Sequence, residues 1–432
     1  MQKLYTIALY LFYPLIWLYL RYCYRHFPEY INAMSQLRGR IKFQSDGRDV
    51  LWFHAASVGE VVQAAMLVQA TLTDGKRLVD QFQIILTTNT PTGAIQCKKL
   101  LGNSVKHLFA PLDYPYFVNR FIRKIKPKKI ILIERELWPN WLRVCGQNKI
   151  KIILANARLT DKTLAQYRKW RWLRNSILRN VDMILPQSQT DKLNFSRLGF
   201  EQHRLCECGN VKYAMQLSTN NQLKIQKLQN GLSYSHSHYW VAGSVHPHEV
   251  ELCLQSYLQL QKQYDDICLV LAPRHPDKFQ HAIEKSKQLG LKTQLFSVSP
   301  IIAADADVMI IDEMGELLPY YAIADICLVG GTFEESIGGH NILEPAYFAK
   351  PIIIGPYGKN IQSLIDVFLK EQALCQIQKH INKHDTFNQS LCELMGKLFA
   401  QPELCEKMGS SAKAILESHA HAAQQQAELI AK

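Results

Sequence analysis

The sequence lacks several features that would place it in a simple class. Its 11 cysteines are scattered and odd in number, which excludes a paired disulfide framework and favours a reducing compartment. Neither a Gly-Lys-Ser/Thr phosphate loop nor a GxGxxG fingerprint is present. Acidic residues are few, 37 against 50 Lys and Arg, so the formal net charge is +13. This balance predicts an anionic partner, which could be nucleic acid, a membrane surface or a phosphorylated substrate.

Composition removes further classes. Of the 432 residues, 47% are hydrophobic and 20% are charged, which is enough for packed cores and excludes a disordered or collagen-like chain. The mean hydropathy of -0.13 excludes a polytopic membrane protein. No repeat and no low-complexity tract is visible. At roughly 150 residues per domain, the length predicts two or three domains.

One uncharged apolar run lies near the N-terminus, over residues 4–20, with basic residues on both sides. A full membrane span needs about 20 apolar residues, so this run is marginal, and Pro14 interrupts it. No small-residue cleavage site follows, while the tyrosines and Trp17 are typical of the headgroup level of a bilayer. We expect a signal anchor or monotopic membrane helix. The alternative is a buried first helix of a soluble domain.

The rest of the chain has the pattern of two α/β halves, in which short apolar runs alternate with amphipathic stretches. The predicted strands are 50–54, 83–87, 129–133, 151–155 and 183–185, then 239–242, 267–272, 308–311, 326–329 and 351–354. The predicted division is an anchor at 1–24, an N-terminal domain at 25–213, a linker at 214–230, a C-terminal domain at 231–409 and a final helix at 410–432. Two doubly wound parallel sheets would carry their ligand sites at the carboxyl ends of their strands, in a cleft between the halves.

The first predicted strand ends in a turn of small residues, His54 to Glu60. Ser57 and Gly59 allow a tight entry into the next helix, whose backbone N–H groups would face a ligand. Glu60 falls in the first turn of that helix. Its carboxylate could simply favour the helix dipole, or it could act as a general base.

A second group of charges, Glu134-Arg135-Glu136, directly follows the strand at 129–133. Two carboxylates and a guanidinium at a strand end are costly unless they are paired or used. If the strand continues, Glu134 and Glu136 project on the same side, and one of them could pair with Arg158. Structural pairing and catalysis both remain open for this group.

In the second half, glycine-rich and basic loops follow successive strands. Arg274 is a natural phosphate ligand. Gly330 and Gly331 predict a backbone N–H cradle for a phosphate, and Glu344 is placed to accept the hydroxyls of a ribose. The histidines at 246, 248 and 275 match no metal-site spacing, so we predict no metal.

Two basic stretches, 120–129 and 168–174, are solvated helix faces by default. The second alternates cations with tryptophans, which favours an interface with an anionic membrane surface. No nucleic-acid-binding motif accompanies the charge, so a nucleic-acid partner is disfavoured.

Together, the segments HAASVGE, ERELWPN, NARL, GNVKY, AGSVHPHE, LAPRHP and MGELLPYYAIADICLVGGTFEESIGGHNILEPA resemble the lipid A-specific 3-deoxy-D-manno-octulosonic acid (Kdo) transferases of glycosyltransferase family 30. The resemblance covers nearly the whole chain in the family's motif order. It implies a GT-B fold of two Rossmann-like domains, with an N-terminal membrane anchor. It also implies inverting transfer of Kdo from CMP-Kdo to a tetraacylated lipid A precursor, without metal or other cofactor, at the cytoplasmic face of the inner membrane.

The resemblance also assigns residues. Glu60 matches the catalytic base, and Glu134 is the second catalytic candidate. Ser57, Gly59, Glu136 and Arg158 fall on the acceptor side. The donor-binding motifs contain Pro273, Arg274, Met314, Gly315, Glu316, Gly331, Thr332, Asn341 and Glu344.

Two other functions remain as alternatives. One is a different glycosyltransferase, or a sugar-nucleotide epimerase, of the same fold. The other is a catalytically inactive, membrane-bound nucleotide sensor.

Overall fold

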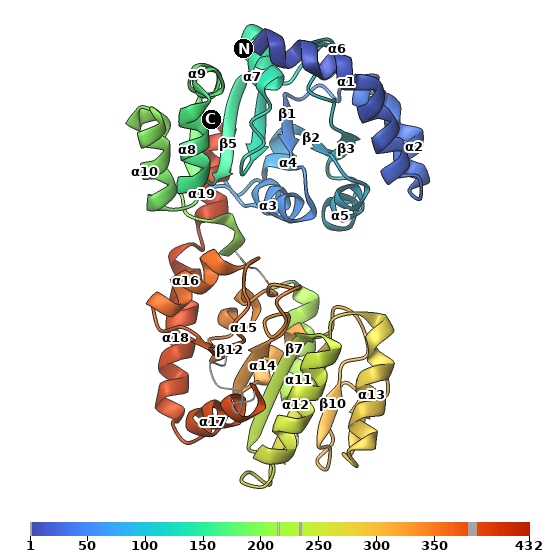
Figure 1. The fold of residues 1–432 in the computed structure, drawn as a ribbon, viewed down its shortest axis with the longest axis vertical. Coiled ribbons are helices and arrows are strands. Elements are labelled where there is room, and N and C mark those ends of the chain that lie inside the picture. Colours follow the sequence, from blue (N-terminus) through green and yellow to red (C-terminus); the bar gives the residue numbers. More distant parts are fainter. Residues whose placement is uncertain (1, 214, 216, 233–235, 379–386) are drawn as a thin grey trace. The chain divides into compact units, whose positions relative to one another are not determined.

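A computed structural model describes residues 2–213, 215, 217–232, 236–378 and 387–432. The chain forms two compact units (Figure 1). Unit 1 contains residues 1–214 and 419–432, and unit 2 contains residues 215–418. The end of the chain therefore returns to unit 1, whereas the sequence predicts a single helix at 410–432 that continues from the C-terminal domain.

Unit 1 is built on a parallel sheet of six strands in the order β3-β2-β1-β4-β5-β6. The strands are β1 (Val50–His54), β2 (Gln83–Thr88), β3 (Lys106–Phe109), β4 (Lys129–Ile133), β5 (Lys151–Ala157) and β6 (Met183–Pro186). β1 is buried on both faces because Trp52 packs into one hydrophobic cluster while Leu51 and Phe53 pack into the other. Such continuous apolar strands are typical of parallel sheets covered by helices on both sides.

The helices of unit 1 are α1 (Gln2–Cys23), α2 (Pro28–Ala33), α3 (Val58–Gln69), α4 (Leu78–Gln81), α5 (Pro91–Leu101), α6 (Pro115–Ile125), α7 (Pro139–Gln147), α8 (Asp161–Lys169), α9 (Arg171–Asn180), α10 (Gln189–Leu198) and α19 (Ala422–Ala431). Several begin with a Ser or Thr whose hydroxyl accepts a backbone N–H of the first turn, as at Ser57, Thr90, Thr160 and Ser188. These side chains satisfy N–H groups that have no partner within the helix.

Helix α1 lies against unit 1 through one stripe of half-buried residues, at positions 2, 5, 6, 9, 13, 16, 17 and 20 (Figure 1). Tyr5 donates to Asp113 Oδ2 at 3.0 Å, and Thr6 donates to Asn140 Oδ1 at 2.9 Å. No residue of α1 is buried, and its other face is apolar and exposed. Within the described part of the chain, α1 is the helix long and apolar enough to cross a membrane.

Unit 2 is a second parallel sheet, in the order β13-β12-β11-β7-β8-β10-β9. Its strands are β7 (His238–Val245), β8 (Ile267–Pro273), β9 (Thr293–Leu295), β10 (Val308–Ile310), β11 (Ile326–Val329), β12 (Ile352–Ile354) and β13 (Cys375–Gln376). Its helices are α11 (Thr219–Gly231), α12 (Pro247–Leu260), α13 (Phe279–Gln288), α14 (Leu318–Ile323), α15 (Leu343–Tyr347), α16 (Gln362–Lys370), α17 (Phe387–Phe399) and α18 (Pro402–Ser418).

Two segments differ from the sequence-based expectation. Helix α11 occupies most of the predicted linker at 214–230 and packs against α14. The predicted final helix at 410–432 is instead the end of α18 followed by α19. Gly409 does not mark a helix start. It lies inside α18, where a Cβ atom would collide with the carbonyl oxygen of Ala349, so the glycine permits close packing.

The loop after β11 is held by the buried side chain of Glu249, in the first turn of α12. Oε2 of Glu249 accepts the N–H groups of His246 at 2.9 Å and Gly331 at 2.8 Å. Oε1 accepts those of Thr332 and Phe333, each at 3.0 Å. Glu249 is 1% exposed, so one carboxylate satisfies four backbone donors away from water.

We expect Glu249→Ala to destabilise the protein by about 3–5 kcal/mol, because buried N–H groups lose a charged acceptor. Glu249→Gln retains one oxygen, so its loss should be smaller. Glu251→Ala is the matched control, because Glu251 lies on the same helix as Glu249, is partly exposed and pairs with Lys285 of α13 at 3.0 Å. Its loss should stay below about 1 kcal/mol. The measurement is urea unfolding by circular dichroism, and equal midpoints for Glu249→Ala and the control would contradict this role.

Candidate active site

Each sheet has a point near its middle where the strand order reverses, and polar loops follow the strands on both sides of it. In unit 1 the reversal lies between β1 and β4, which pair in parallel. In unit 2 it lies between β7 and β11. Loops at such a point diverge to opposite faces of the sheet and leave a crevice at the carboxyl ends of the strands. Glu60 follows β1, while Glu134 and Glu136 follow β4.

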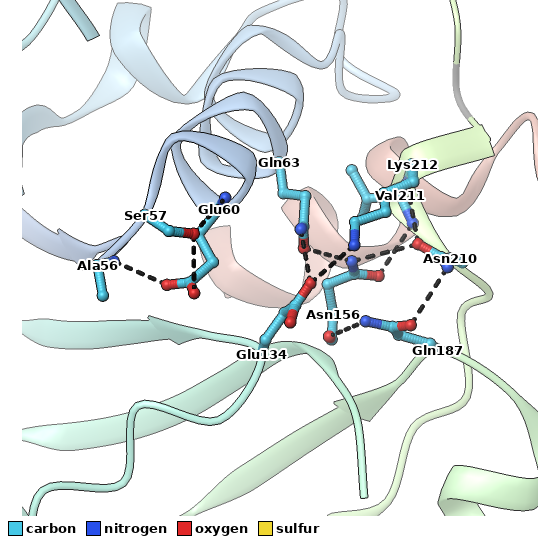
Figure 2. A network of polar contacts seen from close by, with 10 residues as sticks. All are labelled: Ala56, Ser57, Glu60, Gln63, Glu134, Asn156, Gln187, Asn210, Val211 and Lys212. Atoms are coloured by element: carbon cyan, nitrogen blue, oxygen red, sulfur yellow. Dashed lines mark hydrogen bonds and ion pairs between the residues drawn. The ribbon is translucent and has the colours of Figure 1, made fainter. Parts of the chain in front are cut away.

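Glu60 is partly buried at the start of α3, with Ser57 as N-cap (Figure 2). One carboxylate oxygen accepts the Ala56 N–H at 2.7 Å, and the other accepts the Ser57 hydroxyl at 3.1 Å. Burial raises the pKa of Glu60 above its ordinary value, and the negative charge of Glu136 adds to this, while the Ala56 N–H opposes it. The side chain therefore stabilises the helix start and also has a strengthened affinity for a proton.

Glu134 has a different environment from Glu60. Strand β4 ends just before Glu134, whose backbone φ is 58°. The strand therefore does not continue through Glu134 and Glu136, as it would have to for both side chains to project on the same side. Oε1 accepts Gln63 Nε2 at 2.7 Å and Lys212 Nζ at 2.9 Å (Figure 2). Burial opposes ionisation, but Lys212 and Gln63 outweigh it and hold the pKa of Glu134 below its ordinary value. This carboxylate is kept ionised and holds the Lys212 ammonium.

Glu136 pairs with a buried histidine. His54 Nε2 lies 3.6 Å from Oε2 of Glu136, and the Trp138 indole donates to the same oxygen at 2.9 Å. Burial acts against ionisation here too, but His54 and Trp138 lower the pKa of Glu136 overall. His54 is itself fixed, since its Nδ1 lies 3.0 Å from the Thr87 hydroxyl.

The possible ion pair of Arg158 with Glu134 or Glu136 does not form among the described residues, although the charge of Arg158 helps to lower the pKa of Glu134. Lys212 pairs with Glu134 and His54 pairs with Glu136, whereas Arg158 forms no ion pair there. Its backbone N–H approaches the Glu134 carbonyl at 3.5 Å. The reason is the left-handed turn at Glu134, which directs that side chain toward α3 and Lys212. The Gly59 position is exposed and has open space around it, as a ligand-facing helix start requires.

A network of side-chain amides lies behind Glu134 (Figure 2). The fully buried Asn156 is the last residue but one of β5 and has a φ of 47°. Its Nδ2 donates to Gln63 Oε1 at 2.6 Å, and its Oδ1 accepts the Val211 N–H at 3.0 Å. Its backbone N–H donates to Gln426 Oε1 of α19 at 2.8 Å. The network thus links α3, β5, α19 and the segment that carries Lys212.

In unit 2, the structure brings several of the predicted donor residues together. Asn341 Nδ2 donates to Glu344 Oε1 at 3.2 Å. Burial raises the pKa of Glu344, while Asn341 and the nearby charge of Arg274 oppose the rise. Arg274 is exposed, and within the described residues its guanidinium has no ion-pair partner. His246 and His340 stack beside it, with their Nε2 atoms 2.9 Å apart.

The predicted phosphate cradle at Gly330 and Gly331 needs correction, as does the donor-binding role expected for Thr332. The Gly330 N–H donates to the Gly243 carbonyl at 2.9 Å. The N–H groups of Gly331 and Thr332 are occupied as well. Both N–H groups donate to Glu249, and Thr332 is fully buried, so neither donor is free for a ligand. The Thr332 hydroxyl is also used, since it donates to the Val329 carbonyl at 2.8 Å. The glycine pair is nevertheless required, because Gly331 has a φ of 72°.

The remaining donor candidates lie at the ends of neighbouring strands. Pro273 closes β8 and is buried. Met314 is exposed, and Gly315 has a φ of 90° in the turn after β10. Glu316 forms an ion pair with Lys224 of α11, with both carboxylate oxygens 2.6 Å from Nζ. Its carboxylate is therefore already paired within unit 2.

Gln63, Lys212 and Glu249 are among the residues of these networks that were not identified from the sequence. Glu249 had a detectable signal, because it stands three residues after His246 at a helix start, the spacing of a capping box. Lys212 lies in the GNVKY segment, but nothing in the sequence indicates which side chain it contacts. Gln63 had no signal of its own, since it appears as one polar residue on an apolar helix.

Comparison with known proteins identifies the family. Residues 33–215 match the family model described as 3-deoxy-D-manno-octulosonic-acid transferase (kdotransferase). A protein of that name from Haemophilus influenzae is 34% identical over 76% of this chain and 75% of its own length. Another, from Aquifex aeolicus, is 31% identical over 76% of this chain and 81% of its own length.

A solved structure of UDP-GlcNAc 2-epimerase from Neisseria meningitidis has a TM-score of 0.55 to this chain. It is 13% identical and covers 89% of this chain and 100% of its own. This likeness concerns the fold alone, and it confirms the predicted GT-B-like architecture of two parallel α/β sheets. The chain belongs to the 3-deoxy-D-manno-octulosonic acid (Kdo) transferases, a family of glycosyltransferases.

Proposed function

We propose that the protein transfers Kdo from CMP-Kdo to a tetraacylated lipid A precursor, with inversion and with Glu60 as general base. The observation that supports Glu60 as the general base is the contrast in pKa among the three carboxylates of unit 1. The pKa of Glu60 is raised, while those of Glu134 and Glu136 are lowered by Lys212 and His54. A raised pKa makes a carboxylate a better proton acceptor near neutral pH, so Glu60 is the one suited to the reaction.

In this mechanism, unit 1 binds the acceptor and unit 2 binds the donor. The proton of the attacking sugar hydroxyl goes to Glu60 as the oxygen bonds to the anomeric carbon of Kdo. The bond from that carbon to the phosphate oxygen breaks on the opposite face, and CMP leaves with the electron pair. Arg274 supplies positive charge for the leaving phosphate, and its lack of an ion-pair partner among the described residues supports this role.

Membrane association completes the proposal. The acceptor is a lipid, and α1 presents an exposed apolar face that would contact a bilayer. Basic residues after α1 favour the cytoplasmic face of the inner membrane. The polar contacts of Tyr5 and Thr6 with unit 1 support a helix that lies on the membrane surface, since a spanning helix would leave them.

We expect Glu60→Gln to retain CMP binding and lose transfer by roughly 10²–10⁴-fold, because no carboxylate remains to accept the proton. Product mass after incubation with CMP-Kdo and the lipid A precursor measures the activity. Glu403→Gln is the matched control, since Glu403 also lies in the first turn of a helix, in unit 2. Near-normal turnover of Glu60→Gln would remove it from the base role. Transfer from UDP-sugars in place of CMP-Kdo would contradict the donor assignment.

The rate of transfer should fall at acidic pH, because Glu60 must be deprotonated to act. Glu136→Gln removes a negative charge that raises the pKa of Glu60. The acid limb of the pH–rate profile should therefore move to lower pH in this variant, whatever its maximal rate. Glu371→Gln, at an exposed position of unit 2, provides the control. An acid limb at the same pH as in the native protein would show that Glu136 does not tune the base.

For the donor side, Arg274→Ala should weaken CMP binding by about 10- to 100-fold, the worth of a charge-assisted hydrogen bond. Arg274→Lys should restore part of the affinity through its charge. Lys278→Ala is the control, because Lys278 is a nearby cation already paired with Asp277 at 2.9 Å. Calorimetric titration with CMP gives the dissociation constants. Equal affinities for Arg274→Ala and the native protein would reject the contact.

A further inference from the structure

A cavity of about 730 Å³ lies in unit 1, at the amino end of β5. Its walls come from α7, α9, the segment before β5 and the first described residue of α1. Four cations line it: Arg143, Lys149, Lys151 and Arg179. A volume of this size accommodates a small polar headgroup.

The protein compensates only part of the positive charge of this cavity. Within the described part of the chain, none of the four cations forms an ion pair. Asp182 is the one acidic residue in the lining, and its Oδ2 already accepts the Ile152 N–H at 2.7 Å. Ser176 also lines the cavity, and its hydroxyl is buried without a partner. Four cations and one carboxylate leave the lining with a net formal charge of +3, so the cavity favours a negatively charged ligand.

The cavity is separate from the candidate active site. Lys151 is the first residue of β5, whereas Asn156, which supports Glu134 through Gln63, is near its other end. At about 3.3 Å per residue, these positions are roughly 17 Å apart along the strand. A ligand at Lys151 is therefore not the group that receives Kdo beside Glu60.

The apolar helix α1 borders the cavity. Gln2 lines the cavity, and the Tyr5 ring lies 5.8 Å from the ring of Trp172 on α9. Leu4 and Leu11, on the opposite face of α1 from Tyr5, are 64% and 74% exposed. Exposed apolar side chains beside unpaired cations form the combination that binds an anionic lipid surface.

We propose that this cavity binds the phosphate of an anionic membrane lipid headgroup, and so fixes how unit 1 sits on the bilayer. The proposal rests on the membrane association proposed above and adds a specific site to it. A membrane lipid fits better than a free phosphate, because the cavity borders the start of α1 at Gln2, two positions before the exposed Leu4 of that apolar helix. The site acts independently of the acceptor that is glycosylated.

The test compares the full-length native protein with the triple variant K149Q/K151Q/R179Q, which removes exposed cations and leaves the half-buried Arg143 in place. The matched control K262Q/K287Q/K407Q removes the same charge from exposed positions of unit 2. Sedimentation with phosphatidylglycerol vesicles should show on the order of 100-fold weaker binding for the triple variant, about five-fold per cation. Binding to neutral phosphatidylcholine vesicles should be equal for all three proteins.

A second measurement distinguishes binding of a lipid headgroup in the cavity from binding of the protein to a bilayer. Dihexanoyl-phosphatidylglycerol, below its micelle concentration, should bind the native protein and the control but not the triple variant. Binding of this soluble lipid without vesicle binding would support the site and contradict membrane association. Equal loss of affinity for anionic vesicles in the triple variant and the control would overturn the site. Displacement of the soluble lipid by inorganic phosphate at equal concentration would assign the cavity to free phosphate and also overturn the proposal.

Discussion

Buried backbone groups at the carboxyl ends of parallel strands need hydrogen-bond partners, and the whole site depends on how this need is met. Each unit uses a buried polar side chain at or beside the point where its strand order reverses. In unit 2, the Glu249 carboxylate accepts the N–H groups of the turn after β11. In unit 1, the Asn156 side-chain amide joins β5 to Gln63 of α3, and the Gln426 side chain of α19 accepts the Asn156 backbone N–H. Because these partners are fixed, the neighbouring loops hold their functional side chains in defined positions.

This rigidity divides three nearby carboxylates into different roles. Glu134 is held by Gln63 and Lys212, and Glu136 is held by His54 and Trp138, so both stay ionised. Glu60 has hydrogen bonds from Ala56 and Ser57, and it forms no ion pair within the described part of the chain. The two ionised neighbours then raise its pKa further, because like charges favour its protonated form. All three side chains are glutamates, so the differences in their pKa come from their partners and surroundings.

The sequence predicted the strands well, because uninterrupted apolar runs such as those of β4 and β8 are the direct signature of a buried parallel strand. It missed β3, β9 and β13, which are short and partly exposed. The positions of Glu60 and Arg274 followed from the strand ends. Their partners did not, because pairs such as Glu134 with Lys212 join residues 78 positions apart. The left-handed turn at Glu134 was also invisible, since such a φ is uncommon for glutamate.

The return of the chain to unit 1 shows why local pattern could not give the complete site. Helix α19 looks like an ordinary polar terminal helix, yet Gln426 is fully buried and bonds to the backbone of Asn156. Lys129 at the start of β4 donates to the Ile430 carbonyl at 2.7 Å, which satisfies the end of the same helix. The last residues thus complete the network behind Glu134, a carboxylate almost 300 positions earlier. A local change in α19 should therefore reach the geometry around Lys212 through hydrogen bonds alone, without altering any residue of β4.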